Sequence, residues 1–367
     1  MDRRSFLKAG ALVPAAAVLP KLAHAQQLPF EPRQAEKWRT FEVSTRVEIV
    51  FPEGTTRVWL PVPSVDSDYQ KTIDNAWSGN AQVAKLMHDG KYGAGMLYAE
   101  WPTSEKNPVV ELTSRFATRD RAVDLSSRPA FAEKLGAGER AFYIEGTEHM
   151  PIDGIVKKTA QEITKGAKSE YDKAKAIYEW IVDNTYRDPK TRGCGVGDIK
   201  TMLETGNLGG KCADLNALYV GLARASGLPA RDVYGVRVAK SQFGYRSLGA
   251  GTANVTRAQH CRAEVFLAGF GWVPVDPADV RKVVLEEKAQ PTTLSDPLVQ
   301  AVRPKLFGAW EMNWLAFNTA NDFALPNSKG AKLTFFMYPQ AETAQGRLDS
   351  LDPDNFKYAM TAKELTA

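Results

Sequence analysis

The chain has 367 residues, of which 44% are hydrophobic and 25% are charged, and its formal net charge is +4 at pH 7. Four of the 47 basic residues and one of the 43 acidic residues lie in the first 25 positions, so the remainder is nearly neutral. A near-neutral chain lacks the concentrated basic face that nucleic-acid binding needs, and we expect no nucleic-acid partner. The length suffices for two or three domains.

The first 25 residues have the layout of a twin-arginine export signal. Two arginines at positions 3 and 4 precede a moderately apolar run over residues 9–19, and residues 23–25 form a small-x-small cleavage site. The apolar run is too short to span a bilayer permanently, and no later stretch reaches about 18 continuous apolar residues. The sequence therefore predicts a periplasmic or secreted protein, exported by the twin-arginine pathway, without a membrane span in the mature chain.

Residues 26–150 are predicted to form a β-rich domain. Apolar and polar side chains alternate from Phe41 to Phe51, and a period of two is typical of a half-buried strand. A turn at residues 52–54 leads into a second strand at Val58, and the alternation returns over residues 110–116. Long alternation without a helical period favours an antiparallel sheet. We expect this domain to support the second half of the chain.

Helical periodicity begins after Pro151. Residues 174–182 place five apolar side chains on one helical face, and a glycine-rich loop then runs from Arg187 to Gly210. A second helix is predicted from Cys212 to the glycine and proline at positions 227 and 229, followed by strands near 232–238, 260–267 and 271–275. The fold class is therefore α+β, with a core over residues 151–285. Residues 286–367 are expected to form a C-terminal extension packed on that core.

Cys212 is the candidate nucleophile, because it opens a predicted buried helix directly after two glycines. The free N–H groups and the dipole of a helix N-terminus favour negative charge, which lowers a thiol pKa. The same N–H groups can bind the oxyanion of a tetrahedral intermediate. A single cysteine would more often be a buried structural residue, so the hypothesis depends on its partners.

His260 and Asp276 are the candidate partners. His260 opens one predicted strand, Asp276 ends the next, and a tight turn at Gly269 would place the two strands side by side. An imidazole can take the thiol proton and later protonate a leaving amine. A carboxylate can fix the histidine tautomer and stabilise its charged form. Asp279 is the alternative third member, and a turn is the ordinary role of an Asp-Pro pair such as 276–277.

These segments resemble three motifs of the transglutaminase-like superfamily. Residues 210–214, which lead into 223–231, are similar to its nucleophile helix; 260–266 resemble its histidine strand and 271–277 its aspartate strand. The match covers about residues 150–280 in the right order. The resemblance implies a papain-like core, in which the cysteine helix packs on an antiparallel sheet, and thioester chemistry on amide bonds. Arg262 stands where the family often has an aromatic residue.

The expected function is therefore an exported thiol acyl-transfer enzyme without cofactor or metal. The expected partner is a peptide or protein substrate, and the export signal makes an envelope-associated substrate one candidate. Hydrolysis is favoured over cross-linking, because the chain has no EF-hand-like calcium ligand run and the loop over residues 240–259 looks like an open lip. The aromatic stretch 310–317 is the one feature that could wall an amine channel. The alternatives are a non-catalytic envelope binding module, a cross-linking transglutaminase, and a peptidoglycan-linked factor suggested by the compartment alone.

Several other residues have two interpretations. Asp214 and Asn216 fit helix-surface or capping roles better than substrate contact. Trp180 and Tyr186 suit either the cleft or the core. The polar and aromatic segment 313–318 could close one side of the cleft.

The two remaining cysteines form a candidate disulfide. Cys194 lies in the glycine-rich loop and Cys261 follows the histidine, and no cysteine spacing is that of a structural zinc site. Neighbouring residues of a strand point to opposite faces. We therefore expect Cys261 to turn away from the Cys212 thiol.

Overall fold

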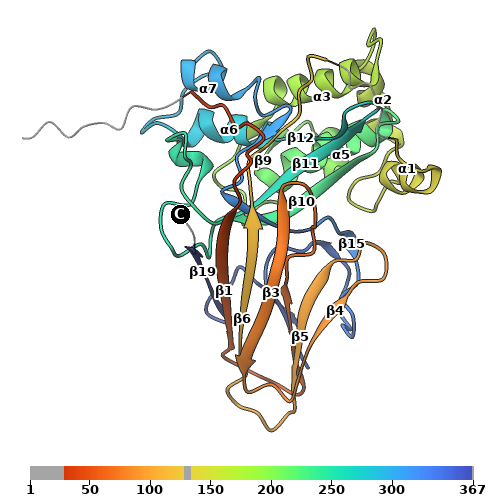
Figure 1. Cartoon of the computed structure of the whole chain (residues 1–367). Helices are drawn as coiled ribbons and strands as arrows, with labels where there is room; N and C mark the ends of the chain where they lie inside the picture. Colours follow the sequence, from red (N-terminus) through yellow and green to blue (C-terminus); the bar gives the residue numbers. More distant parts are fainter. Residues whose placement is uncertain (1–28, 128–133, 366–367) are drawn as a thin grey trace, which may run out of the picture.

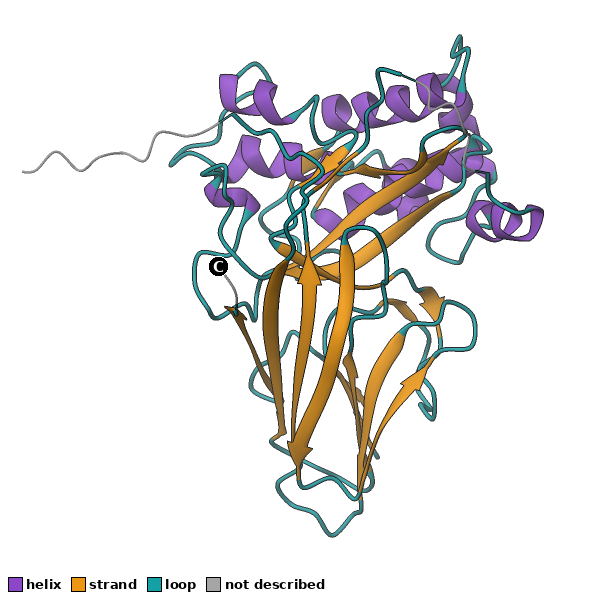
Figure 2. Cartoon of the chain, viewed as in Figure 1, coloured by secondary structure: helices purple, strands orange, loops and turns teal. Residues whose placement is uncertain are grey.

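The computed structural model describes residues 29–127 and 134–365, and the predicted signal lies outside these residues. The chain forms an α+β structure with two ends. Long antiparallel strands make one end, and helices packed on a smaller sheet make the other (Figures 1 and 2). This arrangement confirms the predicted fold class.

The first sheet of the β end is antiparallel. Its strands are β1 (Arg39–Ile49), β3 (Gln70–Gly79), β6 (Val109–Thr118) and β19 (Phe356–Glu364), in the order β19-β1-β6-β3. Phe41 lies opposite Phe116 across β1 and β6, and their rings stack with centroids 5.6 Å apart. Every second residue of β1 from Phe41 onward is buried, as the alternating sequence predicts.

A second sheet packs on the first. It consists of β2 (Thr56–Pro61), β4 (Val83–His88), β5 (Gly95–Trp101), β17 (Gln340–Thr343) and β18 (Gly346–Leu348), in the order β18-β17-β2-β5-β4. One hydrophobic cluster joins side chains of both sheets, among them Val47, Val58, Leu97 and Leu112. The two sheets therefore form a sandwich around a shared apolar layer.

The last eighty residues are distributed over the whole molecule. β19 pairs with β1, and β17 pairs with β2, so the end of the chain completes both sheets of the sandwich. A third strand of this segment, β14 (Trp314–Asn318), pairs with a strand of the helical end. The segment 286–367 thus contributes strands to all three large sheets.

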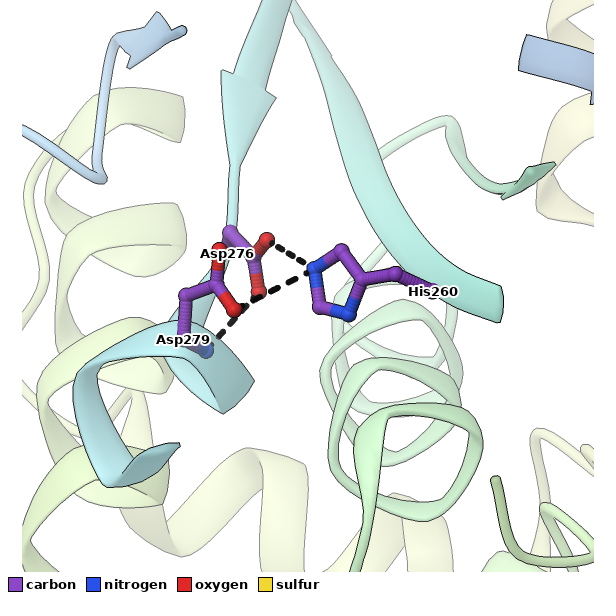
Figure 3. Close-up of side chains that lie close together, drawn as sticks. All are labelled: His260, Asp276 and Asp279. Atoms are coloured by element: carbon purple, nitrogen blue, oxygen red, sulfur yellow. Dashed lines mark hydrogen bonds and ion pairs between the residues drawn. The ribbon is translucent and has the colours of Figure 1, made fainter. Parts of the chain in front are cut away.

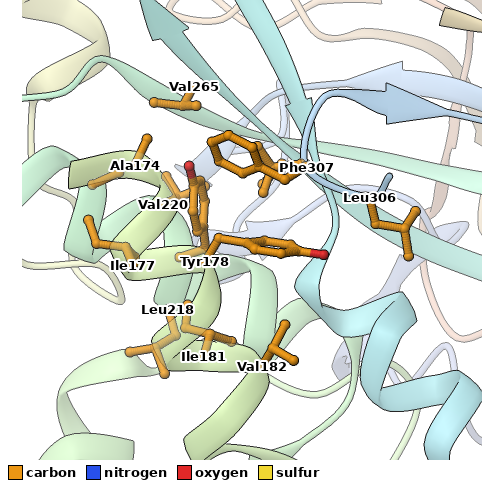
Figure 4. Close-up of a cluster of buried hydrophobic side chains, with 14 of the residues drawn as sticks. Ala174, Ile177, Tyr178, Ile181, Val182, Leu218, Val220, Val265, Leu306 and Phe307 are labelled. Atoms are coloured by element: carbon orange, nitrogen blue, oxygen red, sulfur yellow. The ribbon is translucent and has the colours of Figure 1, made fainter. Parts of the chain in front are cut away.

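The helical end is built around the sheet β12-β11-β10-β14. Its other strands are β10 (Ala230–Arg237), β11 (Gln259–Leu267) and β12 (Gly271–Val275). Helix α5 (Cys212–Ala225) lies against this sheet and is buried from Cys212 to Arg224. Helices α2 (Gly154–Ile163), α3 (Glu170–Asn184) and α6 (Pro277–Glu286) pack around α5. The apolar stripe of α3 meets α5 and β11 in one cluster (Figure 4).

Short elements complete the described chain. They are α1 (Ala137–Ile144), α4 (Ile199–Thr205), α7 (Pro297–Val302), the 3-10 turn η1 (Arg246–Leu248), β7 (Arg121–Ala122), β8 (Tyr186–Arg187), β9 (Gly209–Gly210), β13 (Ala309–Trp310), β15 (Asn321–Phe323) and β16 (Leu333–Phe335). Among the described residues, no helix combines the length and the apolar character that a bilayer span requires.

Candidate active site

Cys212 is the first residue of α5, and the loop before it is fastened to the helix by Asp214. The Asp214 carboxylate accepts hydrogen bonds from the backbone N–H groups of Val196 (2.9 Å), Gly197 (2.9 Å) and Lys211 (3.0 Å). Asp214 therefore has the capping role that the sequence favoured. It ties the loop at residues 196–197 to the residue before Cys212.

Two glycines make room for this carboxylate. A Cβ atom at Gly195, where φ is +99°, would lie 1.8 Å from Asp214 Oδ2, and one at Gly210 would lie 2.5 Å from Asp214 Cβ. Both distances are impossible for real atoms. In the structure, both glycines admit the side chain that shapes the helix start.

His260 faces two carboxylates (Figure 3). Its Nε2 atom lies 2.8 Å from Asp276 Oδ2 and 3.3 Å from Asp279 Oδ1. The antiparallel pairing of β11 with β12 brings Asp276, just beyond β12, to the histidine. Asp276 is also the N-cap of α6, where it accepts the backbone N–H of Asp279 at 3.0 Å. Because Nε2 is used by the carboxylates, Nδ1 is the ring nitrogen left for the thiol.

Arginines balance the two buried carboxylates. Arg237 donates two hydrogen bonds to Asp279, at 2.5 and 2.7 Å. Arg262 lies 3.7 Å from Asp276, and its guanidinium stacks over the rings of Trp310 and Trp314. The family often has an aromatic residue at position 262. Here the arginine at that position packs against the aromatic rings of Trp310 and Trp314.

Two further residues position the histidine, and we predicted other roles for both. Asn216 is buried and donates to the carbonyl of Cys261 (2.8 Å) and to Asp276 Oδ1 (3.3 Å), so the predicted surface position is wrong. Trp314 Nε1 donates to the carbonyl of His260 at 3.0 Å. The segment 313–318 therefore supports the histidine from inside the sheet and does not border the cleft. The sequence signal for this role of Asn216 was its place one helical turn after Cys212, on the same face of the predicted helix.

The charges around the site favour a thiolate–imidazolium pair. Burial and Arg237 lower the pKa of His260, but Asp279 and Asp276 outweigh them and raise it to about 9. Hydrogen bonds from Cys194 and Cys261 hold the pKa of Cys212 well below its ordinary value, and a hydrogen bond with His260 adds to the effect. Both shifts favour the ionised forms at neutral pH, which is the state in which a cysteine nucleophile attacks.

The two carboxylates differ in their electrostatic state. Burial and the charge of Asp279 raise the pKa of Asp276, whereas Arg237 and His260 hold the pKa of Asp279 well below its ordinary value in spite of burial. Asp279 is therefore an anion fixed by arginine. Asp276 makes the shorter contact with the ring, and we take it as the partner of the histidine.

The other two cysteines also lie at the nucleophile. Cys261 Sγ is 3.8 Å from Cys212 Sγ, so the prediction that it turns away is wrong. Cys261 and His260 do point to opposite faces of β11, but the face of Cys261 is the one that α5 covers, and Cys261 packs with Cys212, Ala213 and Leu215. All three cysteines are free thiols, including the candidate pair Cys194 and Cys261.

A cleft of about 890 Å³ opens over the thiol, and both Cys212 and His260 line it. One wall comes from residues 252–259, the end of the predicted lip. This wall is tied to β19 by the bonds from Val255 N to Met360 O (2.9 Å) and from Ala362 N to Ala253 O (2.8 Å). Residues 350–359 supply further lining. The aromatic stretch 310–317 is buried elsewhere and forms no part of the lining, and Trp180 and Tyr186 do not border the cleft either.

The cleft lining is basic. Arg187, Arg192, Lys211 and Arg257 border it, and among its described lining residues none is acidic. Arg187 is paired with Glu286, and Arg192 with Asp349 at 2.6 Å. Lys211 donates to the carbonyl of Thr191 at 2.7 Å, so its charge has no carboxylate partner within the described chain.

The histidine and the two aspartates are also the one group of described residues with the spacing of metal ligands. Arg237 already binds Asp279 through two hydrogen bonds, and Arg262 lies beside Asp276. A cation would have to displace these arginines from a buried site. The donor set therefore fits an ion-pair network better than a metal centre.

A cysteine at a helix start, beside a histidine–aspartate pair from two adjacent strands, defines a papain-like cysteine hydrolase or transferase fold. The sequence model of the Transglutaminase-like superfamily matches residues 157–277, and that of the twin-arginine pathway signal matches residues 1–20. An uncharacterised protein of Haemophilus influenzae (strain ATCC 51907 / DSM 11121 / KW20 / Rd) is 38% identical over 343 residues, which cover 89% of this chain and 91% of the relative. The chain belongs to the transglutaminase-like superfamily and carries a twin-arginine export signal.

A solved structure shares the fold. A protein of Cytophaga hutchinsonii, named as a candidate cysteine protease, superposes with a TM-score of 0.55 at 14% identity, over 90% of this chain and 92% of its own. The periplasmic domain of TgpA from Pseudomonas aeruginosa overlaps less, with a TM-score of 0.33 at 14% identity over 73% of this chain and 93% of that domain. The first likeness extends over both ends of the molecule.

Proposed function

We propose that this protein is an exported cysteine amidase or peptidase, with Cys212 as nucleophile, His260 as general acid–base and Asp276 as the residue that orients the histidine. One observation carries the proposal. Cys212 and His260 line the same cleft, and Asp276 occupies Nε2 at 2.8 Å, which leaves Nδ1 for the thiol. The depressed pKa of the thiol and the raised pKa of the imidazole support it.

The reaction follows from these positions. The Cys212 thiolate forms a bond with the carbonyl carbon of an amide, and His260 gives its proton to the nitrogen as the C–N bond breaks. A thioester remains on Cys212 after the amine leaves. His260, now neutral, takes a proton from the attacking molecule, and the thiolate departs when the thioester is resolved. Asp276 keeps the ring oriented and stabilises its positive charge in the first step.

Fewer backbone N–H groups are available to bind the oxyanion than the sequence suggested. The N–H of Ala213 donates to the carbonyl of Cys194 at 2.9 Å and is therefore occupied. The N–H of Cys212, at the first helical position, has no partner inside the helix. We assign the oxyanion to this group and to the side-chain amide of Gln259, which lines the cleft and contacts Met360 Sδ at 3.4 Å and the side chain of Tyr358.

Water is the acceptor that the cleft favours. A cross-linking enzyme must deliver an amine and exclude water, which requires a closed channel. The aromatic stretch 310–317, the one sequence feature that could wall such a channel, is buried in the core and supports His260. This placement supports hydrolysis over transfer to a lysine.

The basic lining indicates the substrate class. Four cations and no carboxylate border the cleft, so a peptide with an acidic residue near the scissile amide fits it best. Lys211 and Arg257 are the two lining cations without a carboxylate partner in the described chain, and they would pair with such a residue.

The proposal is tested by trapping the acyl-enzyme. The mature protein is incubated with blocked peptides that have acidic, neutral or basic flanks, then denatured in acid, and the mass of the Cys212 peptide is measured. We expect an acyl adduct on Cys212 with the acidic set, and free acid as the main product even with excess primary amine. Cys212→Ala is the matched control. Peptide binding without acylation would instead identify a non-catalytic binding module, and dominant amine incorporation a transglutaminase.

A further inference from the structure

Two thiols beside the nucleophile have no part in the proposed reaction. Cys261 Sγ lies 3.8 Å from Cys212 Sγ and 3.9 Å from Met337 Sδ. Cys194 Sγ lies 3.4 Å from the carbonyl of Gln259 and forms a further hydrogen bond with Cys212. The oxidising exterior of a cell is where such a cluster is most exposed to oxidants.

The three thiols are not equivalent. Hydrogen bonds from Cys194 and Cys261 lower the pKa of Cys212. Burial and the hydrogen bonds with Cys194 and Cys212 raise the pKa of Cys261. Cys212 also borders the open cleft, while Cys261 is fully buried behind it. Peroxides oxidise the thiolate that they can reach, which is Cys212. Cys261 is not among the residues that line the cleft.

We propose that Cys261 is a resolving cysteine, which captures oxidised Cys212 as an intramolecular Cys212–Cys261 disulfide. In the first step the Cys212 thiolate attacks one oxygen of hydrogen peroxide, the O–O bond breaks, and Cys212 sulfenic acid and hydroxide form. In the second step Cys261 gives up its proton and attacks the Cys212 sulfur, and water leaves. The sum is two thiols and one peroxide to one disulfide and two waters.

The geometry favours Cys261 over Cys194 as the partner. The two sulfurs of a disulfide are about 2.05 Å apart, so Cys212 and Cys261 must approach by less than 2 Å. The required shift falls at the first residue of α5, next to the glycine-rich loop, where the backbone is least constrained by helical bonds. Cys194 also forms a hydrogen bond with Cys212, but its sulfur is held 3.4 Å from the carbonyl of Gln259 by a second hydrogen bond, and its own backbone carbonyl accepts the N–H of Ala213.

The consequence is reversible protection of the nucleophile. A sulfenic acid that finds no thiol is oxidised further to sulfinic acid, which is irreversible for nearly all proteins. Formation of the disulfide prevents further oxidation of the Cys212 sulfenic acid. A dithiol of low reduction potential can attack Cys212 from the cleft, release the Cys261 thiol and then free Cys212 by closing its own disulfide. The enzyme would be inactive while oxidised and active again after reduction.

The test uses mass and does not depend on turnover, so it stands apart from the proposed function. The reduced mature protein is treated with a small excess of hydrogen peroxide, blocked with N-ethylmaleimide and digested without reductant. We expect the loss of two hydrogen atoms and one cross-linked peptide that contains Cys212 and Cys261. Dithiothreitol should restore three alkylatable thiols. A Cys194–Cys212 link as the main product, an intermolecular disulfide, or no disulfide at all would overturn the proposal.

Two matched variants sharpen the result. Cys261→Ala should accumulate sulfenic acid, seen as a dimedone adduct on Cys212, and then sulfinic acid at least ten times faster than wild type. Cys194→Ala should still form the Cys212–Cys261 disulfide as its main oxidation product, even if the rate changes with the pKa of Cys212. Equal rates of sulfinic acid formation in wild type and Cys261→Ala would contradict the proposed role of Cys261. The wild-type disulfide map decides the question even if Cys261→Ala fails to fold.

Discussion

Replacement of Asp276 by asparagine should move the pH range in which Cys212 is reactive. The amide keeps the size of the side chain and can still contact Nε2, but it cannot stabilise the imidazolium. With less stabilisation the pKa of His260 falls, and the Cys212 thiolate loses its cationic partner, so its pKa rises. The pH range between the two pKa values, in which Cys212 is a thiolate and His260 is protonated, therefore narrows from both sides.

The magnitude follows from the pKa of the histidine. Its rise from 6.5 to about 9, against burial and Arg237, corresponds to about 3 kcal/mol. Asp279 contributes through its charge, and Asp276 contributes through its charge and the shorter contact, 2.8 Å against 3.3 Å for Asp279. With one of the two carboxylates neutralised, we expect the alkaline limit of activity to fall by roughly one pH unit. On a good substrate kcat/KM should fall by about 10²- to 10⁴-fold.

The assay needs no substrate. The rate of Cys212 alkylation by iodoacetamide is measured from pH 4 to 10 (about the range of the two groups), and the modified residue is identified by mass spectrometry. Asp279→Asn is the matched control. It leaves the buried Arg237 without its anion, so it should cost about 3–5 kcal/mol of folding stability. Our assignment would be refuted if Asp279→Asn shifted the alkylation profile more than Asp276→Asn in protein shown to be folded.

Three further outcomes are expected. Cys212→Ala and His260→Ala should each abolish turnover to a similar degree, and the double variant should lose no more, because the pair acts as a unit; thermal melts must show that both variants fold. Gly195→Ala should destabilise the protein by several kcal/mol, because its Cβ would lie 1.8 Å from Asp214 Oδ2, whereas Gly93→Ala has a similar positive φ of +69° and no atom within 4 Å. Similar melting temperatures for these two glycine variants would contradict the role given to Asp214. Arg257→Gln should raise KM several-fold for acidic peptides and leave neutral ones unchanged, and the acidic preference of wild type should weaken with salt; an equal effect on both peptide sets would argue against the basic lining as its cause.

The sequence predicted the helix of Cys212 and the strands of His260 and Asp276 because each is a local pattern. The apolar stripe of α5, the glycine after it and the turn at Gly269 all act over a few residues. The Asp276-Pro277 pair was weighed as a turn or as the histidine partner; in the structure its carboxylate caps α6 and also faces His260. Short-range rules therefore sufficed to order the site along the chain.

The errors concern which face of a strand meets another element. The alternation of His260 and Cys261 was predicted correctly, but no local pattern says that α5 covers the Cys261 side. The aromatic stretch 310–317 was placed beside the cleft because its composition suits a wall, yet β14 enters the sheet next to β10 and buries it. Asn216 was placed at the surface because polar side chains usually lie there. Its partner is the backbone of a strand 45 residues later, which the sequence around it does not reveal.

The pairing of β19 with β1 sets the order in which the protein can mature during synthesis. Phe41 lies opposite Glu364 across this pair, so the first strand of the described chain can complete its pairing only when the last strand is present. The same final strand ties down the loop before His260 and supplies Phe356, Tyr358 and Ala359 to the cleft wall. A ribosome-bound chain, even one with all of α5 and β11 translated, therefore lacks a finished cleft. The cytoplasm would meet the reactive thiol in its working pocket only after β19 has been translated and has paired with β1.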